Sequence, residues 1–352
     1  MSGRPAELEA LRDDWSRLSE ESGNIFLTWE LADAWWRHLG AGREPVFGSV
    51  RRDGRTVAVL PLHRGGRPLR TLRFVGAGVA DQVGAICAPG DLPAAAGELR
   101  RMLGEVPHDL FLADPVDGAE GWSALLGAEP TVHEASPGIE IETSDWDEFL
   151  AGRTANFRQQ AGKYERWLVR DHALSYRFTS DGAQLERDLD LVFELHTRRW
   201  GAGTTEFQQE PMRSLHREFA RAAFERGWLR IWIAELNGRP AAAWYGFRFG
   251  DADWAYQSGR DTSLGWRADC ARRARIGART ACGLTRSCSA RRSTSPASHG
   301  GPRSGQLRHP AHPARPARPP RRPRGAQGAG GFDPPLGWES CSTTAERPSG
   351  RP

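Results

Sequence analysis

The stretch Trp228–Asp261 reads WLRIWIAELNGRPAAAWYGFRFGDADWAYQSGRD, and it decides the fold of this chain. Two apolar-rich runs, Leu229–Leu236 and Ala241–Phe249, are separated by Asn237-Gly238. Because Asn-Gly favours the positive φ angles of a type I′ turn, the pattern predicts a β-hairpin. The run Trp254–Ser258 follows a turn-like segment and predicts a third antiparallel strand. The stretch therefore forms the middle of a half-buried sheet.

The first half of the chain repeats this order of elements. Val46–Arg52 and Thr56–His63 are predicted strands joined by Asp53-Gly54, and Leu69–Val75 is a third. In each half, helices come first, followed by a strand, an Asx-Gly turn and two more strands. We interpret the chain as a duplicated α/β unit.

Apolar residues at three- and four-residue spacing predict the helices, and alternation predicts the remaining strands. Asp181 is the predicted cap of a long helix that ends near Trp200. The other predicted elements are helices at Glu7–Glu21, Trp29–Leu39, Asp91–Leu103 and Met212–Arg226, strands at Asp109–Leu112, Gly138–Ile141 and Ser175–Thr179, and a linker at Ala135–Gly138.

Charge divides the chain near residue 262. The 352 residues carry a net charge of +4, yet residues 262–352 hold 17 basic and only 4 acidic side chains. The run Pro310–Gly331 is low-complexity Pro, Arg, Ala and Gly, which cannot bury enough apolar surface to offset its ordering entropy. We interpret the change in composition as a shift of reading frame close to Asp261–Trp266. A natural disordered basic tail is the alternative.

The compartment is predicted from the same composition. The polar, acidic start differs from a signal peptide, and no apolar run approaches the length of a membrane span. A cytoplasmic protein is expected, with Cys87 as a packed thiol. The spacing of Cys282, Cys288, His309 and His312 is unlike that of structural zinc sites, so no metal is expected.

Four segments together resemble the GNAT superfamily of acyl-CoA-dependent transferases. They are Asn24–Gly40 (NIFLTWELADAWWRHLG), Phe193–Gly201 (FELHTRRWG), the hairpin Trp228–Phe247 and the AYQSGRD end of the third strand. More narrowly, the chain resembles two-domain acetyltransferases of the cellulose-biosynthesis type, which are relatives of the Fem-type transferases.

The resemblance implies a fold, a co-substrate and a site. The fold is α/β, with duplicated GNAT-like mixed-sheet domains over residues 1–137 and 138–262, the second truncated, and a disordered Arg/Pro-rich tail over residues 263–352. Acetyl-CoA is the implied co-substrate, with its pyrophosphate at the N-terminus of a helix after the YQSGRD strand. The sequence after Asp261 shows no such helix, so impaired activity is expected.

The candidate site residues follow from this resemblance and from side-chain chemistry. Strand alternation predicts that Tyr256 and Ser258 share one face and that Gln257 points away. His196 lies on an apolar helix face, where a core histidine is the stronger interpretation. The candidates are Tyr256, Ser258, Glu235 and His196 for catalysis, Gln257, Gly259 and Arg260 for the cofactor, and Arg158, Arg199, Trp200 and Tyr245 for the substrate.

The predicted activity is transfer of an acetyl or acyl group from acyl-CoA to an amine or hydroxyl, in a cleft between the halves. The acceptor is expected to be a small molecule, a polysaccharide or another amine, with neither a membrane nor a specific nucleic acid as partner. One alternative is Fem-type transfer from aminoacyl-tRNA. The other is a non-functional frameshift product whose basic tail binds polyanions.

Overall fold

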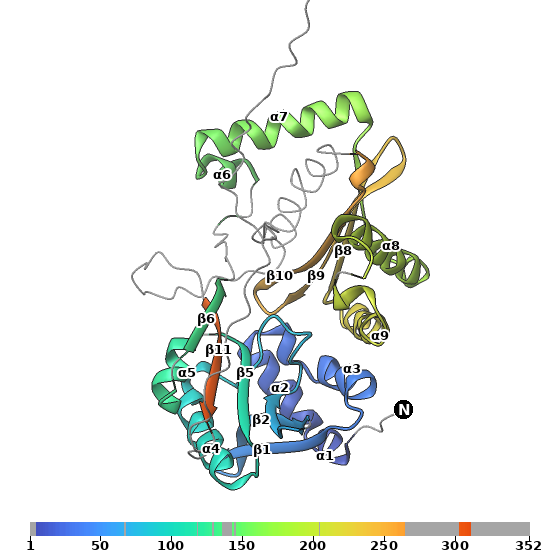
Figure 1. Cartoon of the computed structure of the whole chain (residues 1–352). Helices are drawn as coiled ribbons and strands as arrows, with labels where there is room; N and C mark the ends of the chain where they lie inside the picture. Colours follow the sequence, from blue (N-terminus) through green and yellow to red (C-terminus); the bar gives the residue numbers. More distant parts are fainter. Residues whose placement is uncertain are drawn as a thin grey trace, which may run out of the picture. The chain divides into compact units, whose positions relative to one another are not determined.

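The computed structural model describes residues 5–66, 68–117, 119–128, 130–135, 143, 146–203, 205–264 and 303–310. Residues Met1–Ala311 form one compact unit. The described strands of this unit make two sheets, one mainly from the first half of the chain and one from the second (Figure 1). The predicted α/β class, with a sheet in each half, is confirmed.

The first sheet has seven described strands in the order β1-β2-β3-β5-β11-β6, with β4 beside β2. Its strands are β1 (Glu44–Arg52), β2 (Arg55–Gly65), β3 (Thr71–Phe74), β4 (Ile86–Cys87), β5 (Leu110–Asp117), β6 (Pro130–Ala135) and β11 (Arg303–Pro310). The helices of this half are α1 (Ala6–Ala10), α2 (Arg12–Ser22), η1 (Ile25–Leu27), α3 (Trp29–Leu39), η2 (Pro89–Asp91), α4 (Leu92–Glu105) and α5 (Ala119–Leu126).

Helices cover both faces of the first sheet, as the alternation of β1 requires. Phe47 packs edge-on against Trp15 of α2, with the ring centroids 6.0 Å apart. Its neighbour Gly48 faces α4 instead, where an added Cβ would overlap the sulfur of Met102. One face therefore meets α2 and α3 and the other meets α4 (Figure 1).

The second sheet has four described strands in the order β10-β9-β8-β7. Its strands are β7 (Ser175–Phe178), β8 (Leu229–Leu236), β9 (Arg239–Phe249) and β10 (Ala252–Arg260). The remaining helices are α6 (Trp146–Ala151), α7 (Ala155–His172), α8 (Gly182–Trp200), η3 (Glu206–Gln208), α9 (Met212–Glu225) and η4 (Thr262–Leu264). The large core packs α8 and α9 on this sheet, and a smaller cluster joins Leu168 of α7 to Ala234 and Leu236.

Both predicted Asx-Gly turns are present. Asp53 and Gly54 have φ angles of 51° and 78°, and Asn237 and Gly238 have 51° and 72°. Each pair joins two antiparallel strands, β1 to β2 and β8 to β9. The capping prediction is also confirmed, because the Asp181 side chain accepts a hydrogen bond from the backbone N–H of Ala183.

The structure differs from the prediction in two places, and part of the prediction lies outside the described residues. The predicted helix Glu7–Glu21 is two helices, because the chain leaves regular geometry at Leu11. The predicted strand near Gly138–Ile141, the boundary at residues 137–138 and the linker after its first residue lie outside the described residues, and that first residue, Ala135, ends β6. The tail predicted to be disordered over residues 263–352 includes Arg303–Pro310, and for these residues the prediction is wrong: they form β11, which pairs antiparallel with both β5 and β6. Main-chain pairing is independent of side-chain pattern, so periodicity did not reveal it.

The type I′ turn at Asn237-Gly238 gives a first test. Gly238→Ala should lower the free energy of unfolding by about 1–2 kcal/mol, because its φ of 72° lies in the left-handed region that disfavours a Cβ. Gly97→Ala is the matched control: it lies within α4 with open space around it, and it should stabilise by about 0.5–1 kcal/mol. Urea unfolding measures both, and equal effects would contradict the turn assignment.

Candidate functional site

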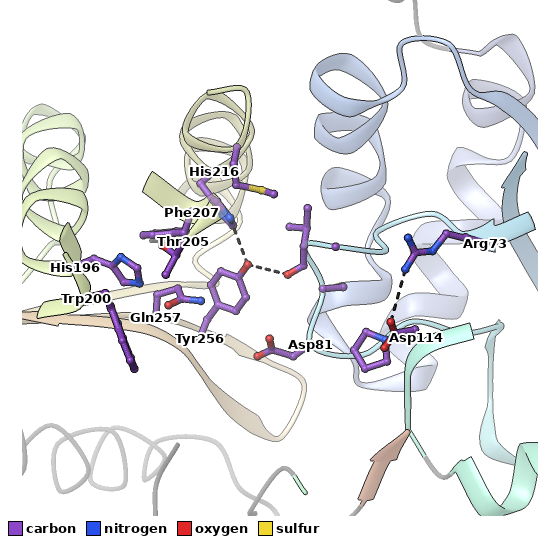
Figure 2. Close-up of a pocket in the computed structure, with 15 residues that line it drawn as sticks. Arg73, Asp81, Asp114, His196, Trp200, Thr205, Phe207, His216, Tyr256 and Gln257 are labelled. Atoms are coloured by element: carbon purple, nitrogen blue, oxygen red, sulfur yellow. Dashed lines mark hydrogen bonds and ion pairs between the residues drawn. The ribbon is translucent and has the colours of Figure 1, made fainter. Parts of the chain in front are cut away.

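A cavity of about 480 Å³ lies between residues of the two halves of the chain (Figure 2). This volume suits a small-molecule ligand. Its described lining comes from β3 and the loop after it, from β5, from the end of α8, from η3 and the residue before it, from the start of α9, and from β10. The lining residues are Arg73, Gly78, Val79, Ala80, Asp81, Asp114, Pro115, His196, Trp200, Thr205, Phe207, Met212, His216, Tyr256 and Gln257.

A β-bulge in β10 shapes this cavity. Ala255 pairs with Gly246 and Gln257 pairs with Tyr245, so Tyr256 is an extra residue with no partner on β9. A bulge locally breaks the alternation of side chains. Tyr256 and Gln257 consequently both line the cavity. The prediction that Tyr256 shares a face with Ser258 while Gln257 points away is therefore wrong, because it assumed a regular strand.

Ser258 is held outside the cavity lining. Its Oγ accepts a hydrogen bond of 2.7 Å from Nη1 of Arg199. The Arg199 guanidinium also lies over the ring of Trp200, 4.4 Å from the centroid. Arg199 thus joins the end of α8 to β10 and leaves Trp200, which is 42% exposed, at the rim.

The Tyr256 phenol connects the two halves. Its Oη donates a hydrogen bond of 2.8 Å to the carbonyl of Val79 and lies 3.3 Å from Nε2 of His216 (Figure 2). Burial raises the pKa of Tyr256 well above its usual value, and the negative charge of Asp81 adds to this effect. The phenol therefore keeps its proton at neutral pH, where its O–H donates the hydrogen bond to the carbonyl of Val79.

Two buried histidines lie beside this phenol. Burial lowers the pKa of His196 to about 4, although a hydrogen bond with Gln257 opposes the shift. His216 is fully enclosed, and burial lowers its pKa to about 3. Both rings are therefore neutral at pH 7. His196 also lies 3.4 Å, through Nδ1, from Nε2 of Gln208. These rings orient neighbours through hydrogen bonds and are weak bases.

The first half contributes Arg73, Asp81 and Asp114, which sequence reasoning missed. Nη2 of Arg73 lies 3.7 Å from Oδ2 of Asp114, and Asp81 is close enough to affect Tyr256. Arg73 was included in a predicted strand, and a charged residue between the buried Leu72 and Phe74 was the available signal. No local pattern marked Asp81 or Asp114, since each lies where separate segments meet.

Three candidates lie away from the cavity lining. Glu235 on β8 accepts a hydrogen bond of 3.0 Å from Nε of Arg177. Arg158 donates to the carbonyls of Ala151 and Arg153, at the start of α7. Tyr245 is fully buried behind the cavity, its ring centroid 5.8 Å from that of Tyr256. The structure therefore gives Glu235 and Arg158 ordinary surface pairings and gives Tyr245 a packing position.

The predicted cofactor-binding residues lie at the end of β10. A Cβ at Gly259 would overlap the backbone nitrogen of His196, so this glycine lets β10 approach α8. Arg260 is half-buried beside it. The Asp261 carboxylate accepts hydrogen bonds from the Ser263 amide and hydroxyl, at 2.9 and 2.6 Å, and from Arg198 at 2.8 Å. These donors are therefore already bound to an anionic side chain.

Within the described part of the chain, no group of three or more His, Cys, Asp or Glu side chains is placed to hold a metal ion. The described helices include none that is both long and apolar enough to cross a bilayer.

Residues 155–272 match the family model described as an acetyltransferase (GNAT) domain. The match contains α7, α8, α9 and the whole second sheet, and with them the bulge at Tyr256. The second half of the chain is therefore similar to a GNAT acetyltransferase domain. No curated protein matches the chain.

Several solved structures are similar in fold. "FemX" has 15% identity and a TM-score of 0.41 over 63% of this chain, which spans 56% of its length. A conserved protein of unknown function from Bacteroides thetaiotaomicron VPI-5482 has 15% identity and a TM-score of 0.48, with 85% of this chain and 96% of that one covered. A tandem GNAT protein from the clavulanic acid biosynthesis pathway has 14% identity and a TM-score of 0.37, covering 87% and 95%.

The buried histidines give a prediction about pH. His63, His196 and His216 have pKa values of about 3, 4 and 3 in the folded chain, against 6.5 for a solvent-exposed histidine. The unfolded chain therefore binds protons below pH 6.5 that the folded chain excludes. The free energy of unfolding should fall as pH drops from about 6.5 to about 4, by up to roughly 4 kcal/mol per pH unit.

Urea unfolding at several pH values measures this slope. His63→Gln should remove about one third of this slope, because His63 is one of the three histidines that each bind a proton on unfolding. A free energy of unfolding that stays constant between pH 7 and pH 5 would contradict the neutral, buried state of these rings.

Proposed function

We propose that this chain derives from an acyltransferase that moves an acetyl or acyl group from acyl-CoA to an amine or hydroxyl in the cavity beside Tyr256. The observation that carries the proposal is the bulge at Tyr256, within the matched GNAT domain. It brings a protonated phenol and an amide side chain to one small-molecule cavity. Residues of the first half close the opposite side.

The chemistry needs few groups. The acceptor nitrogen or oxygen attacks the thioester carbonyl, a C–N or C–O bond forms, and the C–S bond breaks. The acceptor must lose a proton, and Asp81 is the carboxylate in position to accept it. The sulfur must gain one, and the Tyr256 phenol is the proton donor. Gln257 and the neutral His196 orient the groups through hydrogen bonds.

We further propose that the tail results from a shifted reading frame and that CoA binding is impaired. The donors at Ser263 already bind the Asp261 carboxylate. A pyrophosphate would have to displace that carboxylate or use amides beyond residue 264. The change from acidic to basic composition near residue 262 supports the same conclusion. In the unshifted reading frame, the proposed protein is a two-domain, cytoplasmic acetyltransferase of the cellulose-biosynthesis type. Its acceptor is a small molecule, a polysaccharide or another amine.

Tyr256→Phe tests the proton donor. The variant should lower kcat by about 100-fold or more, because general acid catalysis contributes roughly that factor. Tyr176→Phe, on β7 and away from the cavity lining, is the matched control and should keep the rate of the unsubstituted chain. The activity of both variants is measured as thiol release from acetyl-CoA with a panel of amines. Each variant is made in the chain as written and in a frame-restored chain, that is, one encoded with the reading frame corrected near residue 262. Equal rates for both variants would overturn the role of Tyr256.

Calorimetric titration with acetyl-CoA tests the impairment. The chain as written should bind weakly and the frame-restored chain should bind at least about 100-fold more tightly, because several charge-assisted bonds to phosphate, each about 1.5–3 kcal/mol, are regained. Micromolar, saturable binding by the chain as written would show that the tail is genuine. Transfer is also measured with aminoacyl-tRNA as the donor. Transfer only from that donor would favour the Fem-type alternative.

A further inference from the structure

The charged groups of the cavity all come from one side, the N-terminal wall, which we define as Arg73, Asp81 and Asp114. Asp81 lies near Tyr256, and Arg73 lies with Asp114 farther along the wall (Figure 2). The wall therefore has a carboxylate beside the phenol and, at its other end, a guanidinium that a second carboxylate, Asp114, pairs at 3.7 Å. A ligand with charges of both signs fits this polarity.

The guanidinium of Arg73 is incompletely satisfied. Its Nε is buried and has no hydrogen-bond partner among the described residues. Its nearest carboxylate oxygen, on Asp114, is 3.7 Å away, which is longer than the 2.7–3.2 Å of an ordinary N–H···O bond. Arginine presents a planar fork that matches a carboxylate. Arg73 is therefore available to an anionic group of a ligand.

A second guanidinium, that of Arg43, lies near Arg73 but outside the described cavity lining. Arg43 lies close enough that its pKa is lowered, first by its own burial and then by the charge of Arg73. The Arg43 guanidinium also lies 5.3 Å from the Trp35 ring centroid. Like charges held together in a partly buried place favour an anion between or beside them. This second observation is independent of the hydrogen bonding of Arg73.

The opposite side of the cavity is neutral. It consists of aromatic and apolar side chains, the uncharged polar side chains of Thr205 and Gln257, and His196 and His216 in their neutral form. His216 is 1% exposed, and its Nδ1 has no hydrogen-bond partner among the described residues. Phe207 and Met212 lie beside it. This side suits a carbon skeleton and leaves recognition of charge to the N-terminal wall.

We propose that the cavity binds an acceptor that carries both an ammonium group and a carboxylate, that is, an amino acid. The carboxylate lies against Arg73, and the amine lies between Asp81 and Tyr256. The reaction part of this inference rests on the acyl transfer proposed above, whereas the binding part rests on the charges of the wall.

The product is an N-acyl amino acid. The nitrogen attacks the thioester carbonyl, a C–N bond forms and the C–S bond breaks. The ammonium nitrogen loses two protons in all. One ends on the sulfur of CoA, and the other passes through Asp81 to solvent. No oxidant, reductant or further co-reactant is required.

Calorimetry on the full chain, without acyl-CoA, tests the binding. The probes share one skeleton: leucine, leucinamide, 3-methylbutylamine, which lacks the carboxylate, and 4-methylpentanoate, which lacks the amine. A second pair, 5-aminopentanoate and pentylamine, covers a longer separation of the two charges. At least one zwitterion should bind about tenfold or more tightly than its counterpart without a carboxylate, because only the zwitterion can form charge-assisted hydrogen bonds with Arg73.

Variants assign the two ends. Arg73→Gln should abolish the preference for the carboxylate, and Asp81→Asn should weaken the amine-bearing probes while leaving 4-methylpentanoate unchanged. Arg70→Gln is the matched control: Arg70 pairs with Asp109 outside the cavity, at 2.9 Å, and its loss should leave every affinity unchanged.

The inference is overturned if neither zwitterion binds better than its counterpart, or if the preference survives in Arg73→Gln. Acyl transfer is then measured with the same probes in the frame-restored chain. Transfer to 3-methylbutylamine as fast as to leucine would overturn amino-acid selection and leave the acyltransferase proposal standing. Tight zwitterion binding without any transfer would overturn the acyltransferase proposal and leave amino-acid binding standing.

Discussion

The site depends on one local irregularity, the extra residue at Tyr256 in β10. In a regular strand Tyr256 and Gln257 would lie on opposite faces of the sheet. The bulge places both at the same cavity, whereas Ser258 accepts a hydrogen bond from Arg199 outside the cavity lining. Glycine makes this geometry possible on the neighbouring strand: a Cβ at Gly246 would overlap the carbonyl of Trp254. Bulges redirect side chains in this way next to active sites.

A second consequence of the bulge is the contact between the halves. The hydrogen bond from Tyr256 to the carbonyl of Val79 joins the second sheet to a loop of the first half. That loop begins after β3, and it brings Asp81 toward the phenol. The buried carbonyl gains a donor, and the phenol is fixed in position. The hydrogen bond between Tyr256 Oη and the Val79 carbonyl thus both joins the two halves and positions the phenol at the cavity.

Burial separates the two sides of the cavity electrostatically. His196, His216 and Tyr256 are enclosed by aromatic rings, so desolvation keeps each in its neutral form. Charge is found on the N-terminal wall, where Arg73 and Asp114 remain a quarter to a third exposed. Neutral hydrogen-bonding groups beside a charged wall give a polarity that a uniformly apolar cavity would lack.

The sequence by itself determined the secondary structure around its strongest local signals. The turns at Asp53-Gly54 and Asn237-Gly238 were predictable because positive φ restricts the residue types, and the cap at Asp181 because its side chain bonds within two residues. Such interactions are short-range, so they are encoded in adjacent residues. Tyr256, Gln257, His196 and Trp200, which line the cavity, were proposed from the family resemblance and from side-chain chemistry, on elements that the pattern located.

Tertiary structure alone decided which side chains meet. Arg73, Asp81 and His216 are distant in sequence, and their proximity to Tyr256 arises from packing of separate elements. The bulge was hidden because an extra residue in a strand leaves no mark in its composition. Pairing of β11 with β5 and β6 was hidden because backbone bonds are common to every residue type except proline. Glu235 and Arg158 carried suitable chemistry, yet the fold directs them to Arg177 and to the start of α7.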